Sequence, residues 1–170
     1  MQQEADPGGN GAAFGFLTVV ESPAHGFFGG YLLVDGAGRP LEFHCTAPVK
    51  VSRAQAILYG PTLDGHLHGR QIGGALLAEG ALAPVVVLTD LEPMLQVRPH
   101  TSLPVALVRK ADGPADAAGF TVGAAHVGPV GGDPARQATI RERLAELGAA
   151  VDLCEPFERI RAAIEEAQKH

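Results

Sequence analysis

The chain has 170 residues, a formal net charge of -6, and 46% hydrophobic residues. A chain of this length fits one ordinary domain, and its hydrophobic share excludes a disordered protein. The acidic balance argues against binding to nucleic acid, because phosphate contacts need clustered Lys and Arg side chains. We therefore expect a single α/β domain over residues 13–170, preceded by a flexible tail over residues 1–12.

Neither secretion nor membrane insertion is expected from this sequence. The N-terminal segment has no basic stretch followed by an apolar run, so no signal peptide is predicted. The longest apolar run, near residues 83–88, is too short to span a bilayer. The two cysteines, Cys45 and Cys154, lie far apart in apolar surroundings, which predicts buried, reduced thiols. By elimination, we expect a soluble, cytoplasmic protein.

The first third of the chain predicts an antiparallel meander of three strands. Alternating apolar residues and β-favouring side chains mark strands over residues 14–21, 29–35 and 40–46. The glycines of the turn at residues 35–38 supply the positive φ that a tight turn requires. Three aromatic side chains at alternate strand positions are expected in the core: Phe28, Tyr31 and Phe43.

Helical signals begin after the meander. Ser52 and Gln55 form a predicted capping box, in which each side chain satisfies a backbone amide at the start of a short helix. Ala54, Ile57 and Leu58 form the apolar face of this helix, which Gly60 and Pro61 end. A second helix is predicted over residues 63–79. Its glycines weaken it by propensity, so we expect it to pack closely on the sheet.

The remaining elements alternate between strands and helices. The unbroken apolar run over residues 83–90 predicts a central strand that is covered on both faces, with Val86 buried. Asp133 and Pro134 start a helix as its cap and first residue, and that helix is expected to end at Gly148. We also expect a helical turn over 91–97, a strand over 103–109, a strand or edge ribbon over 120–127, and a last helix from Pro156.

Three segments, GGYLLVDGAGRPLEF, SRAQAIL and VVVLTD, carry a resemblance to a known family of folds. Their order resembles the ribonuclease H-like fold, whose core runs strand-strand-strand-helix-strand-helix-strand. The resemblance covers roughly residues 14–109 and rests on element order. It implies a mixed sheet followed by C-terminal helices. It also implies carboxylates gathered around two divalent metals, Mg²⁺ or Mn²⁺, because hard cations take oxygen ligands.

The carboxylates that the resemblance requires are only partly present. Glu21 would supply the acid of the first strand, and Asp90 the acid of the central strand. Gln55 stands where the resemblance implies a glutamate, so one charge is missing and loss of two-metal catalysis is expected. Two plainer interpretations stay open: Asp90 caps the following helical turn, and Glu21 faces water.

Histidines offer a second candidate site. His66 and His68 are two residues apart, which in a helix places their rings on different sides. In an extended segment both rings would share a face and, with Asp64, could bind zinc or manganese. His44 and Cys45 are adjacent on a predicted strand and point to opposite faces, so His44 is expected to be an ordinary exposed or hydrogen-bonded side chain.

Three function classes follow, in order of preference. The first is a non-catalytic binding or assembly module that has no cofactor and engages a protein partner or a second copy. The second is a divergent metal-dependent nuclease or phosphoryl-transfer enzyme that uses Glu21 and Asp90 with Mg²⁺ or Mn²⁺. The third is a metal or small-ligand sensor that uses His44, His66 and His68.

Overall fold

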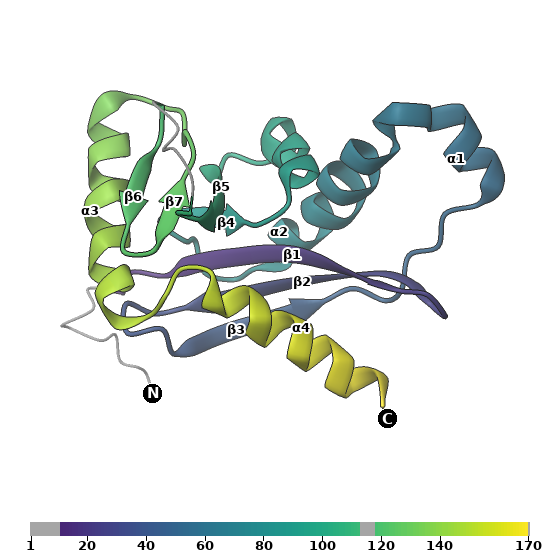
Figure 1. Cartoon of the computed structure of the whole chain (residues 1–170), viewed down its shortest axis with the longest axis horizontal. Coiled ribbons are helices and arrows are strands. Elements are labelled where there is room, and N and C mark those ends of the chain that lie inside the picture. Colours follow the sequence, from purple (N-terminus) through teal and green to yellow (C-terminus); the bar gives the residue numbers. More distant parts are fainter. Residues whose placement is uncertain (1–10, 113–117, 170) are drawn as a thin grey trace.

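The computed structural model describes residues 11–112 and 118–169. Within these residues, seven strands form one mixed sheet in the order β3-β2-β1-β4-β5-β7-β6 (Figure 1). β1 pairs antiparallel with β2 and parallel with β4, which pairs parallel with β5. The predicted α/β class is therefore confirmed. The strands are β1 (Phe14–Ser22), β2 (Gly26–Val34), β3 (Pro40–Cys45), β4 (Val87–Thr89), β5 (Val105–Lys110), β6 (Phe120–Val122) and β7 (Ala125–Val127).

Helices cover both faces of the sheet. The 3-10 helix η3 packs with the π-helix η2 and with α2 on one face, whereas α3 and α4 pack on the other. The predicted C-terminal helices are thus present (Figure 1). The helices are α1 (Arg53–Tyr59), η1 (Gly60–Thr62), η2 (Gly65–Gly73), α2 (Gly74–Glu79), η3 (Glu92–His100), α3 (Pro134–Ala150) and α4 (Glu155–Gln168).

Successive side chains of β1 point alternately into two core layers, one on each face of the sheet. Phe14 and Phe16 face α3 and α4, where the Phe16 ring meets Phe157 edge to face at 5.4 Å between centroids. Leu17 and Val19 face η2 and α2 instead. Such alternation is expected of a strand covered on both faces. Val86 is fully buried, as predicted.

Two consecutive glycines of β2 let both helical layers approach the sheet closely. A Cβ atom at Gly29 would overlap Ile72 of η2, and a Cβ atom at Gly30 would overlap Ile160 of α4. Because the two positions point to opposite faces, one Gly-Gly pair serves both layers. Close helix packing on the sheet was expected, but the glycines that permit it here lie in the strand.

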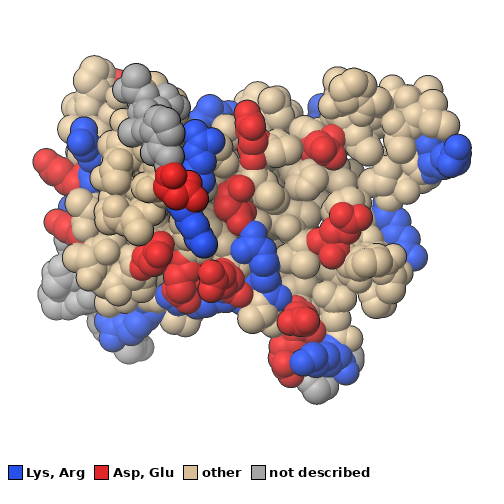
Figure 2. Space-filling model, in the orientation of Figure 1, with Lys and Arg blue, Asp and Glu red and all other residues tan. Residues whose placement is uncertain are grey.

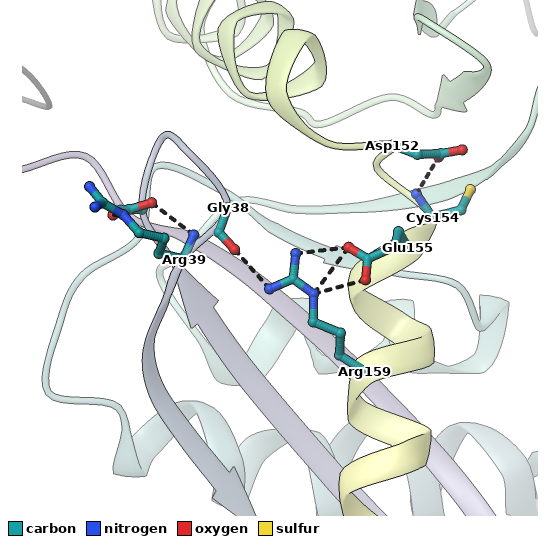
Figure 3. A network of polar contacts seen from close by, with 7 residues as sticks. Gly38, Arg39, Asp152, Cys154, Glu155 and Arg159 are labelled. Carbon is teal, nitrogen blue, oxygen red and sulfur yellow. Dashed lines mark hydrogen bonds and ion pairs between the residues drawn. The ribbon is translucent and has the colours of Figure 1, made fainter.

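A polar network fixes the start of α4 over the turn between β2 and β3 (Figure 3). The Arg159 guanidinium donates to both carboxylate oxygens of Glu155, one turn earlier. It also donates from Nη1 to the carbonyl oxygen of Gly38 at 2.7 Å. This contact joins residues 121 positions apart, so it anchors the C-terminal helix to the meander.

Glycines also line the contact between η2 and η3. The predicted second helix is a π-helix over residues 65–73 that continues as α2. Gly65, Gly69 and Gly73 face η3, where a Cβ atom at Gly69 would lie 2.7 Å from the backbone carbon of Gln96. Backbone thus packs against backbone at this contact.

Several expectations are corrected by the position of β3 at the edge of the sheet. The Phe43 side chain is 42% exposed and Cys45 is exposed, because no described strand lies beyond β3 to cover them. Separately from β3, the other thiol predicted to be buried, Cys154 before α4, is only partly buried. Phe28 and Tyr31 are buried, as predicted.

Other differences concern element boundaries. β4 is shorter than the predicted central strand, although the Val85 amide before it still donates to the Ala13 carbonyl at 2.8 Å. The segment 120–127 folds as the hairpin of β6 and β7, with Gly123 at positive φ in the turn. Ten residues of the predicted tail, 1–10, lie outside the described residues.

The close approach at Gly69 makes a testable difference between two glycines of one helical segment. Gly69→Ala should destabilise the fold by about 1–3 kcal/mol, because the new methyl group meets the backbone of η3. Gly74→Ala is the matched control, since its nearest neighbour would lie 3.9 Å away. The control should be neutral or stabilising by about 0.5–1 kcal/mol. Urea denaturation measures both, and equal effects would contradict the packing described.

Candidate functional site

Asp90 lies at the carboxyl end of β4, where open α/β sheets commonly bind ligands. The Thr18 hydroxyl of β1 donates to Asp90 Oδ1 at 2.6 Å, and the Arg161 guanidinium of α4 pairs with Oδ2. Thr18 is fully buried and reaches Asp90 because β1 and β4 run parallel in adjacent register. Both carboxylate oxygens therefore have protein partners.

Glu21 and Asp90 are not brought together. Thr18 lies on the α4 face of β1, and the regular alternation places Glu21 on the opposite face, with Leu17 and Val19. Glu21 is exposed, in agreement with the plainer interpretation. Gln55 is engaged in the predicted capping box with Ser52, in a helix that contributes no buried residue.

A cavity of about 650 Å³ opens between η1, η2 and η3. Its polar lining combines the basic side chains of His66, Arg70 and His100 with the carboxylates of Asp64 and Glu92. Its volume is within the range typical of small-molecule sites. The other lining residues are Pro61, Thr62, Gly65, Pro93, Gln96 and Pro99.

The two candidate histidines of η2 diverge. His66 stacks on Tyr59, with 4.4 Å between ring centroids. His68 donates from Nδ1 to the backbone oxygen of Asp64 at 2.9 Å, and its ring meets Phe27. The segment is helical, so the extended geometry that a shared metal site required is not formed. Among residues 11–112 and 118–169, no group of three His, Cys, Asp or Glu side chains could hold a metal ion.

His44 forms a hydrogen-bonded cluster at the β3 edge, as expected. Its Nε2 lies 2.7 Å from Glu42 Oε1, and its ring stacks on Tyr31. Glu42 also accepts hydrogen bonds from the amides of Ala81 and Leu82 at 3.0 and 2.9 Å. The hydrogen bond from His44, together with these amides, holds the pKa of Glu42 below its usual value.

The helix α1 forms, with η1, an arm at one end of the molecule (Figure 1). We define the arm as residues 53–62. No residue of α1 or η1 is buried, and the side chains of Ile57 and Leu58 are 68% and 83% exposed. The apolar face predicted from Ala54, Ile57 and Leu58 exists, but it points to solvent and not into the core.

The arm also differs in charge from the rest of this acidic chain. Lys50 and Arg53 lie in or next to it, and no Asp or Glu occurs between residues 43 and 63. On the face drawn in Figure 2, the outermost surface at this end of the molecule shows Lys or Arg (blue) and uncharged residues (tan) but no Asp or Glu (red). The arm therefore presents apolar side chains with Lys50 and Arg53 close by in the sequence.

Comparisons with protein-family models, curated proteins and solved structures found no match to this chain. No helix within the described ranges is long and apolar enough to cross a membrane.

Sequence reasoning missed two partners of Asp90. Thr18 carried a weak signal, since it is a polar residue within an otherwise apolar strand. Arg161 carried none, because its meeting with a residue 71 positions away depends on how α4 lies across the sheet.

The Thr18 hydroxyl should contribute measurably to stability. Thr18→Val keeps the shape of the side chain but removes the donor to Asp90, so we expect a loss of about 1–3 kcal/mol in urea denaturation. Thr18→Ser is the matched control, because it retains the hydroxyl. If Thr18→Val is as stable as wild type, the hydrogen bond to Asp90 contributes nothing to the free energy of unfolding.

Glu42 should make stability depend on acid pH. Its pKa is lower in the folded chain than its ordinary value of 4.5, so its contribution is present above that value and is lost as pH falls through the folded pKa. Between about pH 6 and about pH 3, wild type should lose more unfolding free energy than Glu42→Gln. Parallel losses in the two proteins would show that Glu42 is not linked to folding.

Proposed function

We propose that this chain is a non-catalytic assembly module that binds a protein partner through the arm. The observation that carries the proposal is that α1 buries none of its residues and exposes Ile57 and Leu58. A seven-residue helix gains little stability alone in water, and most helices are stabilised by packing an apolar face. A partner that covers this face would supply that packing.

The chemistry of the arm defines the partner. Ile57, Leu58 and the partly exposed Tyr59 fit an apolar groove, in the manner of an amphipathic helix docked on a protein. Lys50 and Arg53 favour a groove rimmed by carboxylates, because complementary charge speeds association and excludes wrong partners. The partner is therefore a protein with an acidic rim around an apolar groove.

The engagement of Asp90 supports a non-catalytic role over the nuclease alternative. A carboxylate already bonded to Thr18 and Arg161 would have to release both before it could bind a metal. The ribonuclease H-like arrangement stays part of the proposal, supported by the strand order β3-β2-β1-β4-β5 and by the parallel pairing of β1, β4 and β5.

The test compares the arm with another exposed helical surface. The tagged chain captures proteins from an extract of its source cells, and each captured protein is purified and titrated against wild type and two variants. Leu58→Asp should weaken binding about tenfold or more, since a charge enters the centre of the apolar face. Ala145→Asp adds the same charge to an exposed position of α3 and should change nothing.

Two outcomes would contradict the proposal. One is that no captured protein binds in a way that depends on Leu58. The other is cleavage of RNA, DNA or a hybrid duplex in Mg²⁺ or Mn²⁺ that wild type shows and Asp90→Asn loses, which would favour the enzyme.

A further inference from the structure

The β3 strand is an open edge of the sheet, separate from the arm. The Thr46 amide donates to the Gly29 carbonyl of β2 at 3.0 Å. Because the pairing is regular from Glu42 to Cys45, the alternation turns the amides and carbonyls of Phe43 and Cys45 away from β2. Outward backbone groups of this kind are a template for pairing with another strand.

Apolar side chains surround this edge on both faces. Leu41 and Phe43 are 44% and 42% exposed, and Leu82, beside Glu42, is 44% exposed. On the α4 face, an open cavity of about 310 Å³ is lined by Phe28, Cys45, Ile164 and Ala167 among others. A strand added here would cover apolar surface as well as the backbone.

The side chains of β3 are self-complementary about Phe43. If a second β3 pairs antiparallel with the Phe43 residues opposite each other, Glu42 of each copy faces His44 of the other. Leu41 of each copy then faces Cys45 of the other, next to the cavity beneath α4. Each copy already bonds its own Glu42 to its own His44, so this register brings two such hydrogen-bonded pairs together. The facing Phe43 rings add an aromatic pair, which stabilises antiparallel strands.

A register centred on His44 is less favourable. It would set the two imidazoles against each other and leave Glu42 opposite Thr46. The ladder is limited at its other end by the irregular pairing between Leu33 and Val34 and by Pro40. The usable edge is therefore short and centred near Phe43.

We propose that two copies of this chain form a symmetric dimer by antiparallel pairing of their β3 strands about Phe43, which joins the two sheets into one. The pairing exchanges the outward amides and carbonyls of Phe43 across the two-fold axis. It goes beyond the proposed function, because it uses none of the residues of the arm.

Sedimentation equilibrium over a concentration series up to about 100 μM tests the dimer. Wild type should reach twice the chain mass of 17.6 kDa. Phe43→Lys places two like charges opposite each other and should weaken association tenfold or more, with unchanged circular dichroism. Leu58→Asp should leave the dimer intact, which separates this result from the test of the arm. A monomeric wild type, or a dimer indifferent to Phe43→Lys, overturns the proposal.

Cross-linking tests the register and does not depend on the lysine variant folding. Phe43→Cys is made with Cys45→Ser and Cys154→Ser, so that position 43 carries the sole thiol of the chain. Facing hydrogen-bonded residues have Cα atoms about 5.5 Å apart, within the span of a disulfide. Mild oxidation should link position 43 of the two copies. A dimer that does not cross-link overturns the pairing about Phe43.

Discussion

The approach of helices to both faces of β2 at Gly29 and Gly30 is the constraint on which the other layers depend. Ile72 and Ile160 occupy the space that side chains at these positions would take, so η2 and α4 lie closer to the sheet there than a larger residue would allow. The position of η2 sets where η3 can pack, and that of α4 brings Arg161 to Asp90. The Gly29–Gly30 dipeptide thus allows close helix packing in the core layers on both faces of the sheet.

In the described part of the chain, helices pack on both faces of the sheet. At the end of β4, the Asp90 carboxylate is bonded to Thr18 and Arg161 of the same chain. What stays open is peripheral: the arm, the edge at β3, and the cleft beside η3.

Patterns along the chain predicted most elements, because they report local physics. The capping box at Ser52, the cap at Asp133 and the alternation of β1 depend on neighbours within a few residues, and all three are present. Exposure was harder to predict. Phe43 and Ile57 have the composition of core residues, but their burial depends on whether another element lies beyond β3 or α1, which sequence periodicity does not encode.

The candidate site was predicted only in part for the same reason. Asp90 was identified from its place after a central strand, and its partners Thr18 and Arg161 come from a β-strand and a helix far along the chain. Glu21 was paired with Asp90 by element order alone. They are separated because alternate residues of β1 point to opposite faces of the sheet. Which residues of the strand point to which face depends on its register in the sheet.

Because η2 is a π-helix, the direction of the arm depends on the number of residues in η2. A π-helix spaces its hydrogen bonds one residue further apart than an α-helix does, and such segments occur mostly as brief insertions. Deleting one residue from Gly65–Gly73 would rotate the start of η2, to which the arm is joined, by one position, about 100° around an axis with 3.6 residues per turn. The direction of the arm relative to the sheet would then change. Single-residue insertions and deletions in this segment are thus expected to change the direction in which the arm points.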